Sequence, residues 1–339
     1  MTGPIPVHLL TGFLGSGKTT LLRRLLADPA LAGAAVLINE FGEVGLDHHL
    51  VERIDDTIVL LKSGCLCCTI RGELASAIRD LLSARERRLV PAFGRLVIES
   101  TGLADPFPIL TTLRADPVLG RHVALASVIA TVDAVNASAQ LVAHRETLQQ
   151  IASADRIVLT KTDLVEGGAV RLLRERLAAL NPGARIFDVH GADWTATDLV
   201  ATEPMPVGGE GARPPEAASG DDRGGPNHAH HWHGNDIAAF AIAVDRPVDW
   251  TRFGLWLGML LNRHGDKVLR VKGILDLDGE ERPVAIHGVR HLVHPPTHMA
   301  AWPTAERGSR IVFITDGIPQ DRILASLAAF GLLDEGPHP

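Results

Sequence analysis

The sequence predicts an α/β fold, in which a P-loop NTPase domain with a mostly parallel sheet covered by helices precedes a smaller C-terminal α+β domain. Two observations carry this prediction. A phosphate-loop pattern lies between a strand and a helix near the N-terminus, and apolar β-type runs alternate with helical patterns through the first 200 residues. Composition places the boundaries: residues 1–202 form the first domain, 203–235 a flexible histidine-containing linker and 236–339 the second domain.

The phosphate loop is TGFLGSGKTT, residues 11–20. An apolar run precedes it, and leucines at helical spacing follow it. In such a loop the glycines let backbone N–H groups turn toward an anion, Lys18 reaches the outer phosphates, and the Thr19 hydroxyl completes a magnesium shell. The nucleotide-binding residues expected here are Gly12, Gly15, Ser16, Gly17, Lys18, Thr19 and Thr20.

The remaining elements of the first domain follow the same alternation, which indicates βαβ units with ligands at the carboxyl ends of the strands. Predicted strands cover 34–39, 57–61, 95–99, 123–132, 156–160 and 185–189, and predicted helices cover 72–89, 137–153 and 169–180. In the second domain we expect strands at 237–244, 267–277, 283–289 and 310–315, and helices at 250–262 and 320–330.

Two strand ends carry acidic residues that suit a nucleotide switch. The loop NEFGEVGLD, which contains Glu40 and Glu43, follows the strand 34–39. The motif ESTG follows the strand 95–99, where Glu99 could hold magnesium and Gly102 could offer its N–H to a γ-phosphate. We expect Lys18, Thr19 and Glu99 to be the catalytic set.

The three cysteines of the chain, Cys65, Cys67 and Cys68, lie within four residues on a strand-to-helix turn. An odd number of thiols at this spacing does not suit a disulfide framework, whereas thiolates on such a turn suit a soft or borderline metal. They supply three ligands where zinc takes four. The fourth would come from water, Glu40, Glu43, a histidine or a partner protein.

The segment Thr160-Lys161-Thr162-Asp163 is close to the NKxD signature of guanine recognition. The Asp163 carboxylate can accept hydrogen bonds from the N1–H and the exocyclic amine of guanine, a donor pair that adenine lacks, and the Lys161 stem can lie on the base. Thr160 stands where the signature has Asn, so the amide that would brace the pocket is missing. Asp163 disfavours an ATP-using phosphotransferase.

Together, GFLGSGKTT, NEFGEVGLD, GCLCC, ESTG and TKTD resemble the CobW-like family of metal-associated GTPases, relatives of the nickel-handling GTPases that mature urease and hydrogenase. The resemblance covers nearly the whole chain. It implies that Cys65, Cys67 and Cys68 bind metal, that Glu99 serves the magnesium site, and that TKTD is a tolerated guanine motif. The C-terminal segments LRVKG and WP also resemble that family's C-terminal domain.

The linker 203–235 is rich in Gly, Pro, Ala and acids, and it ends in a histidine run that could bind metal weakly. The run comprises His228, His230, His231 and His233. A merely soluble spacer is the alternative.

The bulk composition limits the class of protein. Hydrophobic residues make up 46% and charged residues 22%, the net charge is −7, and the sequence has no basic stripe and no run long enough to span a membrane. We therefore expect a cytoplasmic protein without nucleic-acid or membrane partners.

The function predicted is a GTP-hydrolysing metallochaperone that uses GTP, Mg²⁺ and Zn²⁺ and delivers metal to a metal-dependent client protein, with a homodimer as an option for its assembly. One alternative is a cobalt-handling GTPase that uses Co²⁺ for cobalamin synthesis or nitrile hydratase maturation. Another is a metal-buffering protein with a vestigial nucleotide site.

Overall fold

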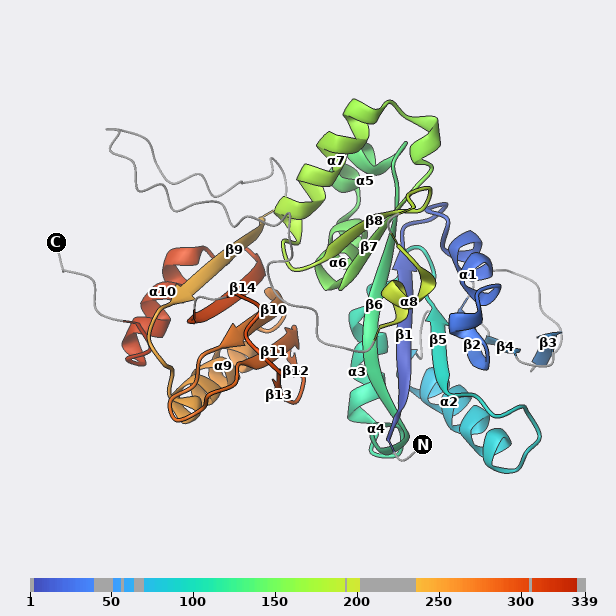
Figure 1. Ribbon diagram of the computed structural model, residues 1–339, viewed down its shortest axis with the longest axis horizontal. Coiled ribbons are helices and arrows are strands. Elements are labelled where there is room, and N and C mark those ends of the chain that lie inside the picture. Colours follow the sequence, from blue (N-terminus) through green and yellow to red (C-terminus); the bar gives the residue numbers. More distant parts are fainter. Residues whose placement is uncertain are drawn as a thin grey trace. The chain divides into compact units, whose positions relative to one another are not determined.

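The computed structural model describes residues 3–39, 51–55, 58–63, 70–192, 194–201, 236–304 and 307–333. The chain divides into two compact units, one formed by Met1–Arg174 and Ala184–Glu203, the other by Glu175–Gly183 and Pro204–Pro339. Each unit is built around its own sheet (Figure 1). Among the described residues, no helix is long and apolar enough to cross a membrane.

The first unit contains an eight-stranded sheet in the order β3-β4-β2-β5-β1-β6-β7-β8. All neighbouring strands are parallel except β3 and β4, so the predicted mostly parallel sheet is confirmed. The apolar runs form strands because both faces of the sheet are covered by helices. The strands are β1 Ile5–Gly12, β2 Ala34–Asn39, β3 Val51–Asp55, β4 Ile58–Ser63, β5 Arg95–Glu99, β6 Val123–Asp133, β7 Arg156–Thr160 and β8 Arg185–Asp188.

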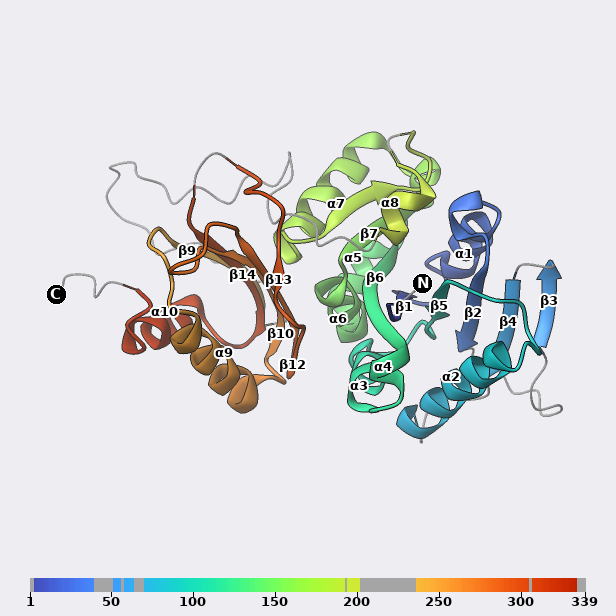
Figure 2. The same ribbon diagram turned by 60° about the horizontal axis from the view of Figure 1, so that its bottom comes forward.

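Helices α1 and α8 lie on one side of this sheet and α2, α3 and α6 on the other (Figure 2). Buried leucines of α1 and α8 pack against β1, β2, β5, β6 and β7 in one apolar cluster. The helical elements up to residue 201 are α1 Lys18–Leu26, η1 Pro29–Leu31, α2 Ile70–Glu86, α3 Phe107–Ala115, α4 Leu119–His122, α5 Ala137–Ala143, α6 Arg145–Ser153, η2 Thr162–Leu164, α7 Gly167–Leu180 and α8 Ala196–Val200, and the part of α7 from Glu175 onward belongs to the second unit.

The prediction of one helix over 137–153 is wrong, because the chain forms two helices that meet at His144. This residue has an extended backbone, with φ −128° and ψ 112°. Its ring packs against Phe13 of the phosphate loop, with the ring centroids 4.4 Å apart. Helical periodicity runs through the break and no Gly or Pro marks it, so the break has no local signal in the sequence.

The second unit has an antiparallel sheet in the order β12-β11-β10-β14-β9, and β13 pairs with β11. In its core, Trp256 of α9 packs on Phe253 of the same helix and on Phe313 of β14. This confirms the predicted α+β architecture. The elements are β9 Ile237–Val244, α9 Trp250–His264, β10 Val268–Leu275, β11 Val284–Val289, β12 Leu292–Val293, β13 Thr297–His298, β14 Ser309–Asp316 and α10 Gln320–Ala329.

Candidate nucleotide-binding site

The phosphate loop connects β1, which ends at Gly12, to α1, which begins at Lys18. Gly15 and Gly17 have φ values of 70° and 87°, in the left-handed region that side chains other than glycine rarely adopt. A Cβ on Gly12 would lie 2.5 Å from the carbonyl oxygen of Thr131. The glycines of the motif are therefore required by the backbone path of the loop, as the sequence pattern implies.

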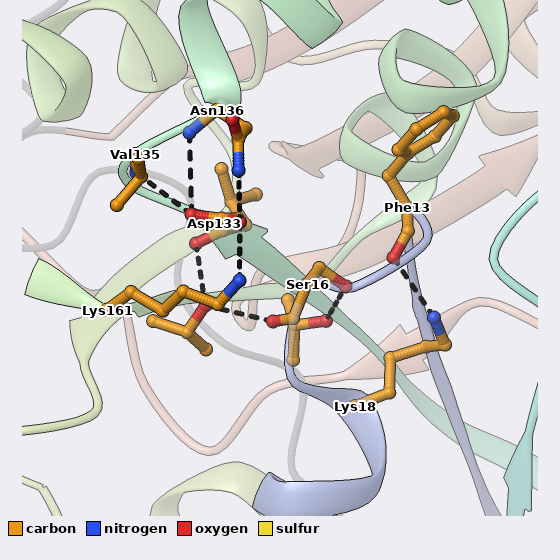
Figure 3. Close-up of polar contacts among 10 residues, drawn as sticks. Phe13, Ser16, Lys18, Asp133, Val135, Asn136 and Lys161 are labelled. Atoms are coloured by element: carbon orange, nitrogen blue, oxygen red, sulfur yellow. Dashed lines mark hydrogen bonds and ion pairs between the residues drawn. The ribbon is translucent and has the colours of Figure 1, made fainter.

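Lys18 lies inside this loop, with 8% of its surface exposed. Its Nζ donates to the carbonyl oxygens of Gly12, at 2.9 Å, and of Phe13, at 3.1 Å. Figure 3 shows the Lys18 ammonium turned toward Phe13. Burial lowers the pKa of Lys18, and the nearby Glu99 carboxylate opposes that shift. Phosphate oxygens of a bound nucleotide could take the place of these two carbonyl acceptors.

Thr19 and Glu99 contact each other at the carboxyl ends of the parallel strands. The Thr19 hydroxyl donates a hydrogen bond to Glu99 Oε1 at 2.7 Å. They come from α1 and from the end of β5, which pairs with β1. A hydroxyl and a carboxylate oxygen are the kinds of ligand that Mg²⁺ takes beside phosphates, so the two side chains fit this ion. The Glu99 side chain is buried, with 5% of the residue exposed.

The loop that follows Glu99 lies directly against the phosphate loop. The Ser100 N–H donates to Leu10 O at 2.9 Å, and the Ser100 hydroxyl donates to the Thr11 hydroxyl at 3.0 Å. A Cβ on Gly102 would come within 2.6 Å of the backbone nitrogen of Leu14. Gly102 thus lies directly against the backbone of the phosphate loop at Leu14.

Thr160 at the end of β7 braces the phosphate loop, whereas no described contact bears on how its replacement of Asn affects the base pocket. Its hydroxyl donates to Ser16 O at 2.9 Å, and its side chain lies 3.4 Å from the position of a Cβ on Gly17. The Ser16 hydroxyl in turn bonds the Thr131 hydroxyl at 2.7 Å. A threonine at this position therefore links the guanine motif to the phosphate loop.

Lys161 is held by a buried carboxylate that the sequence analysis did not single out. Its Nζ lies 2.7 Å from Oδ2 of Asp133, which is 1% exposed at the end of β6. Asn136 and the Val135 N–H bind the same carboxylate (Figure 3). Burial raises the pKa of Asp133, but the hydrogen bonds from Lys161 and Asn136 outweigh it and hold the pKa below its ordinary value. Lys161 has a φ of 56°, so its backbone is also unusual.

Asp163 lies on η2 with its side chain 55% exposed, and His190 Nε2 lies 2.9 Å from its Oδ1. Asp188, at the end of β8, accepts hydrogen bonds from the Thr162 hydroxyl at 2.7 Å and the His190 N–H at 2.9 Å through the same oxygen. The loop after β8 therefore stands beside the guanine motif. Asp133 and Asp188 both end parallel strands, and this is the signal that could have pointed to them.

Thr20 is an exposed residue of α1. Other expected site residues lie outside the described part of the chain, namely Glu40, Glu43, Cys65, Cys67, Cys68, His228, His230, His231 and His233. Among the residues that the structure does describe, no group of three or more His, Cys, Asp or Glu could hold a metal ion. The expected transition-metal site therefore stays a prediction.

Comparison with known families decides the relationship. Residues 6–188 match the family "CobW/HypB/UreG, nucleotide-binding domain", and residues 237–331 match "Cobalamin synthesis protein cobW C-terminal domain". The chain belongs to the CobW/HypB/UreG family. This confirms the resemblance inferred from the motifs, and it identifies the first domain as a nucleotide-binding domain.

Individual relatives are similar to this chain over nearly its full length. The chain is 37% identical over 327 residues to "Zinc chaperone YjiA" of Escherichia coli, covering 96% of this chain and 98% of that one. The crystal structure of Zn(II)-bound YjiA GTPase from E. coli has 34% identity and a TM-score of 0.70, covering 97% of this chain and 99% of that one. A Zn(II)-bound triple mutant of YjiA, with one glutamate and two cysteines replaced by alanine, has 34% identity and a TM-score of 0.72, covering 98% of this chain and 100% of that one.

Proposed function

We propose that this chain is a GTP-hydrolysing metallochaperone, which binds zinc at Cys65, Cys67 and Cys68 and delivers it to a client protein under the control of nucleotide state. The observation that carries the GTPase part is the contact of Thr19 with Glu99, because it puts magnesium ligands from two elements beside Lys18. The names of the relatives, zinc chaperone and GTPase, support the choice of cargo and nucleotide.

Each described residue has a role in this proposal that follows from its position. Lys18 binds the outer phosphates, while Thr19 and Glu99 hold magnesium and the water around it. Asp163 reads the N1–H and amine of guanine, and Lys161, fixed by Asp133, supports the base. The hydrolytic step needs no covalent intermediate, since positioning and charge neutralisation account for most phosphoryl-transfer catalysis.

The metal part rests on ligand chemistry. Thiolates at Cys65, Cys67 and Cys68 leave zinc one ligand short, and Glu40 or Glu43 completes the shell in the GTP state. In the YjiA variant zinc is bound although one glutamate and two cysteines are replaced, so that relative also holds zinc through other groups. In this chain the histidine run 228–233 would supply such auxiliary ligands.

The experiment that tests the function measures zinc affinity against a chromophoric chelator, first with GDP and then with a non-hydrolysable GTP analogue. We expect tighter zinc binding with the analogue, by a factor in the typical range of about 5- to 150-fold for coupled sites. By linkage, zinc should raise affinity for the analogue over GDP by the same factor. The variant Lys18→Ala, which loses the phosphate contact, should bind zinc equally in both conditions.

Equal zinc affinities in the native protein would contradict nucleotide control. Repeating the titration with cobalt separates the proposed cargo from the cobalt alternative. Absence of GTP hydrolysis, with zinc binding intact, would instead support a metal buffer with a vestigial nucleotide site.

A further inference from the structure

Gln150 of α6 binds the loop that follows β5, and none of the nucleotide motifs contains it. Its Nε2 donates to the carbonyl oxygens of Gly102 and of Ala104, each at 3.1 Å. The side chain is 1% exposed, so water does not compete for these bonds. Because both acceptors are carbonyls, the amide orientation is determined: the nitrogen must face the loop.

The loop is thereby held by contacts with two different elements. Gly102 lies against Leu14 of the phosphate loop, so closely that a Cβ would clash with its backbone. Gln150 holds the carbonyls of Gly102 and Ala104. The Ala104 N–H donates to Thr101 O at 3.2 Å, which closes the segment into a turn. Gln150 therefore holds the peptides that follow Gly102 and Ala104. The Ala104 N–H, through Thr101 O, connects them to the peptide that carries the Gly102 N–H.

Helix α6 also contacts the phosphate loop. His144, which precedes the first residue of α6, packs on Phe13. Thr147 and Gln150 follow at intervals of three residues and are buried on the same helix. One rigid helix thus contacts both loops that would surround a γ-phosphate, at Phe13 and at Gly102.

Gln150 carries an unmet hydrogen-bond acceptor in this buried position. Within the described part of the chain, its Oε1 has no hydrogen-bond partner, and neither has the Thr147 hydroxyl. A leucine would fill a similar volume without that penalty. A glutamine at this position is therefore explained by the two donors that it supplies to the loop and not by packing.

We propose that Gln150 is a positioning residue for the loop 101–104, which it presets for contact with the γ-phosphate and so favours GTP over GDP. The inference rests on the proposed GTPase function and deepens it. The peptide N–H of Gly102 is the group that meets the γ-phosphate, and GDP lacks that phosphate. Losing Gln150 should therefore weaken binding of the triphosphate and leave binding of the diphosphate almost unchanged.

The test compares Gln150→Leu with Gln149→Leu, a neighbour on the same helix. For Gln150→Leu we expect affinity for a non-hydrolysable GTP analogue to fall about 10-fold, and kcat to fall with it, because two hydrogen bonds that order the loop are lost. Affinity for GDP should stay within about two-fold of the native protein. Gln149→Leu should match the native protein in all three measurements.

An equal loss of affinity for GDP and the analogue, as an unfolded or loosened domain would give, overturns the proposal. So does an unchanged ratio of the two affinities in a folded variant. Hydrogen exchange of the amides of residues 100–105 is a readout that does not depend on nucleotide: Gln150→Leu should accelerate it and Gln149→Leu should not. If the native protein bound no GTP, the proposed function would fail, whereas this exchange result would still decide the role of Gln150.

Discussion

His190 Nε2 lies 2.9 Å from Oδ1 of Asp163, the carboxylate that we propose reads guanine. A carboxylate has room for about four hydrogen bonds, and guanine needs two of them. His190 can therefore stay in place and orient Asp163 while the base binds. Its backbone is anchored independently, because its N–H donates to Asp188.

We expect His190→Ala to lower affinity for GTP and GDP by about 2- to 10-fold, the effect of one hydrogen bond that orders a binding group. The preference for GTP over inosine triphosphate, which lacks the exocyclic amine, should narrow. Fluorescence titration with labelled nucleotides measures both. His190→Gln, which keeps a donor at similar reach, should recover most of the loss, and the exposed His122→Ala serves as a control. Tighter GTP binding in His190→Ala would mean that His190 competes with guanine.

Guanine specificity should rest on Asp163 itself. The native protein is expected to prefer GTP over ATP by a large factor, because adenine leaves the carboxylate without its two donors. Asp163→Asn offers an amide donor in place of one acceptor, and preference should shift toward xanthosine triphosphate, whose base carries an oxygen where guanine has the amine. Competition assays with the three nucleotides measure this. Equal affinity of the native protein for ATP and GTP would refute the assignment.

His8 should make the first unit sensitive to acid. It is fully buried in β1, its Nδ1 bonds the Ser127 hydroxyl at 2.8 Å, and burial together with Arg95 and Arg156 lowers its pKa from 6.5 to about 3. Below pH 6.5 His8 is protonated in the unfolded chain but stays neutral in the folded chain. The free energy of unfolding therefore falls as the pH drops from 6.5 toward 3.

In this window the free energy of unfolding should fall by about 1.4 kcal/mol per pH unit because of His8. Above pH 6.5 His8 contributes no pH dependence to it. Urea unfolding of the native protein, His8→Gln and His122→Gln at pH 7.5, 6.5 and 5.5 tests this. The free energy of unfolding of His8→Gln should decline less between pH 6.5 and 5.5 than that of the other two. Parallel declines in all three proteins would show that His8 is not the group responsible.

Deleting residues 228–233 should lower the number of weakly bound metal ions and leave one tight site and GTP hydrolysis intact. Thiolates hold zinc more firmly than a flexible run of imidazoles, whose ordering opposes binding. Replacing Cys65, Cys67 and Cys68 by Ser should remove the tight site. Metal titrations on both variants measure this. A tight site lost with the histidines and kept without the cysteines would reverse the assignment.

The sequence by itself determined the class of the fold, the nucleotide motifs and the family. Strands β1, β5 and β7 were predictable because buried parallel strands are short apolar runs, and the phosphate loop was predictable because its backbone requires Gly15 and Gly17 with positive φ. These constraints involve residues that are close in the sequence, so the sequence alone is enough to predict them. The motifs also indicated which strand ends would carry Glu99 and Asp163.

The tertiary structure decided which other residues support those motifs. Thr160 braces Ser16 from 144 positions away, and Gln150 bonds Gly102 across 48 positions. Neither contact has a local pattern, because each depends on how strands and helices are placed side by side. The break at His144 has no local pattern either: helix periodicity continues through it, and the ring of His144 packs on Phe13, which is distant in the sequence. The residues that support the site are thus determined by long-range packing, which no short stretch of sequence contains.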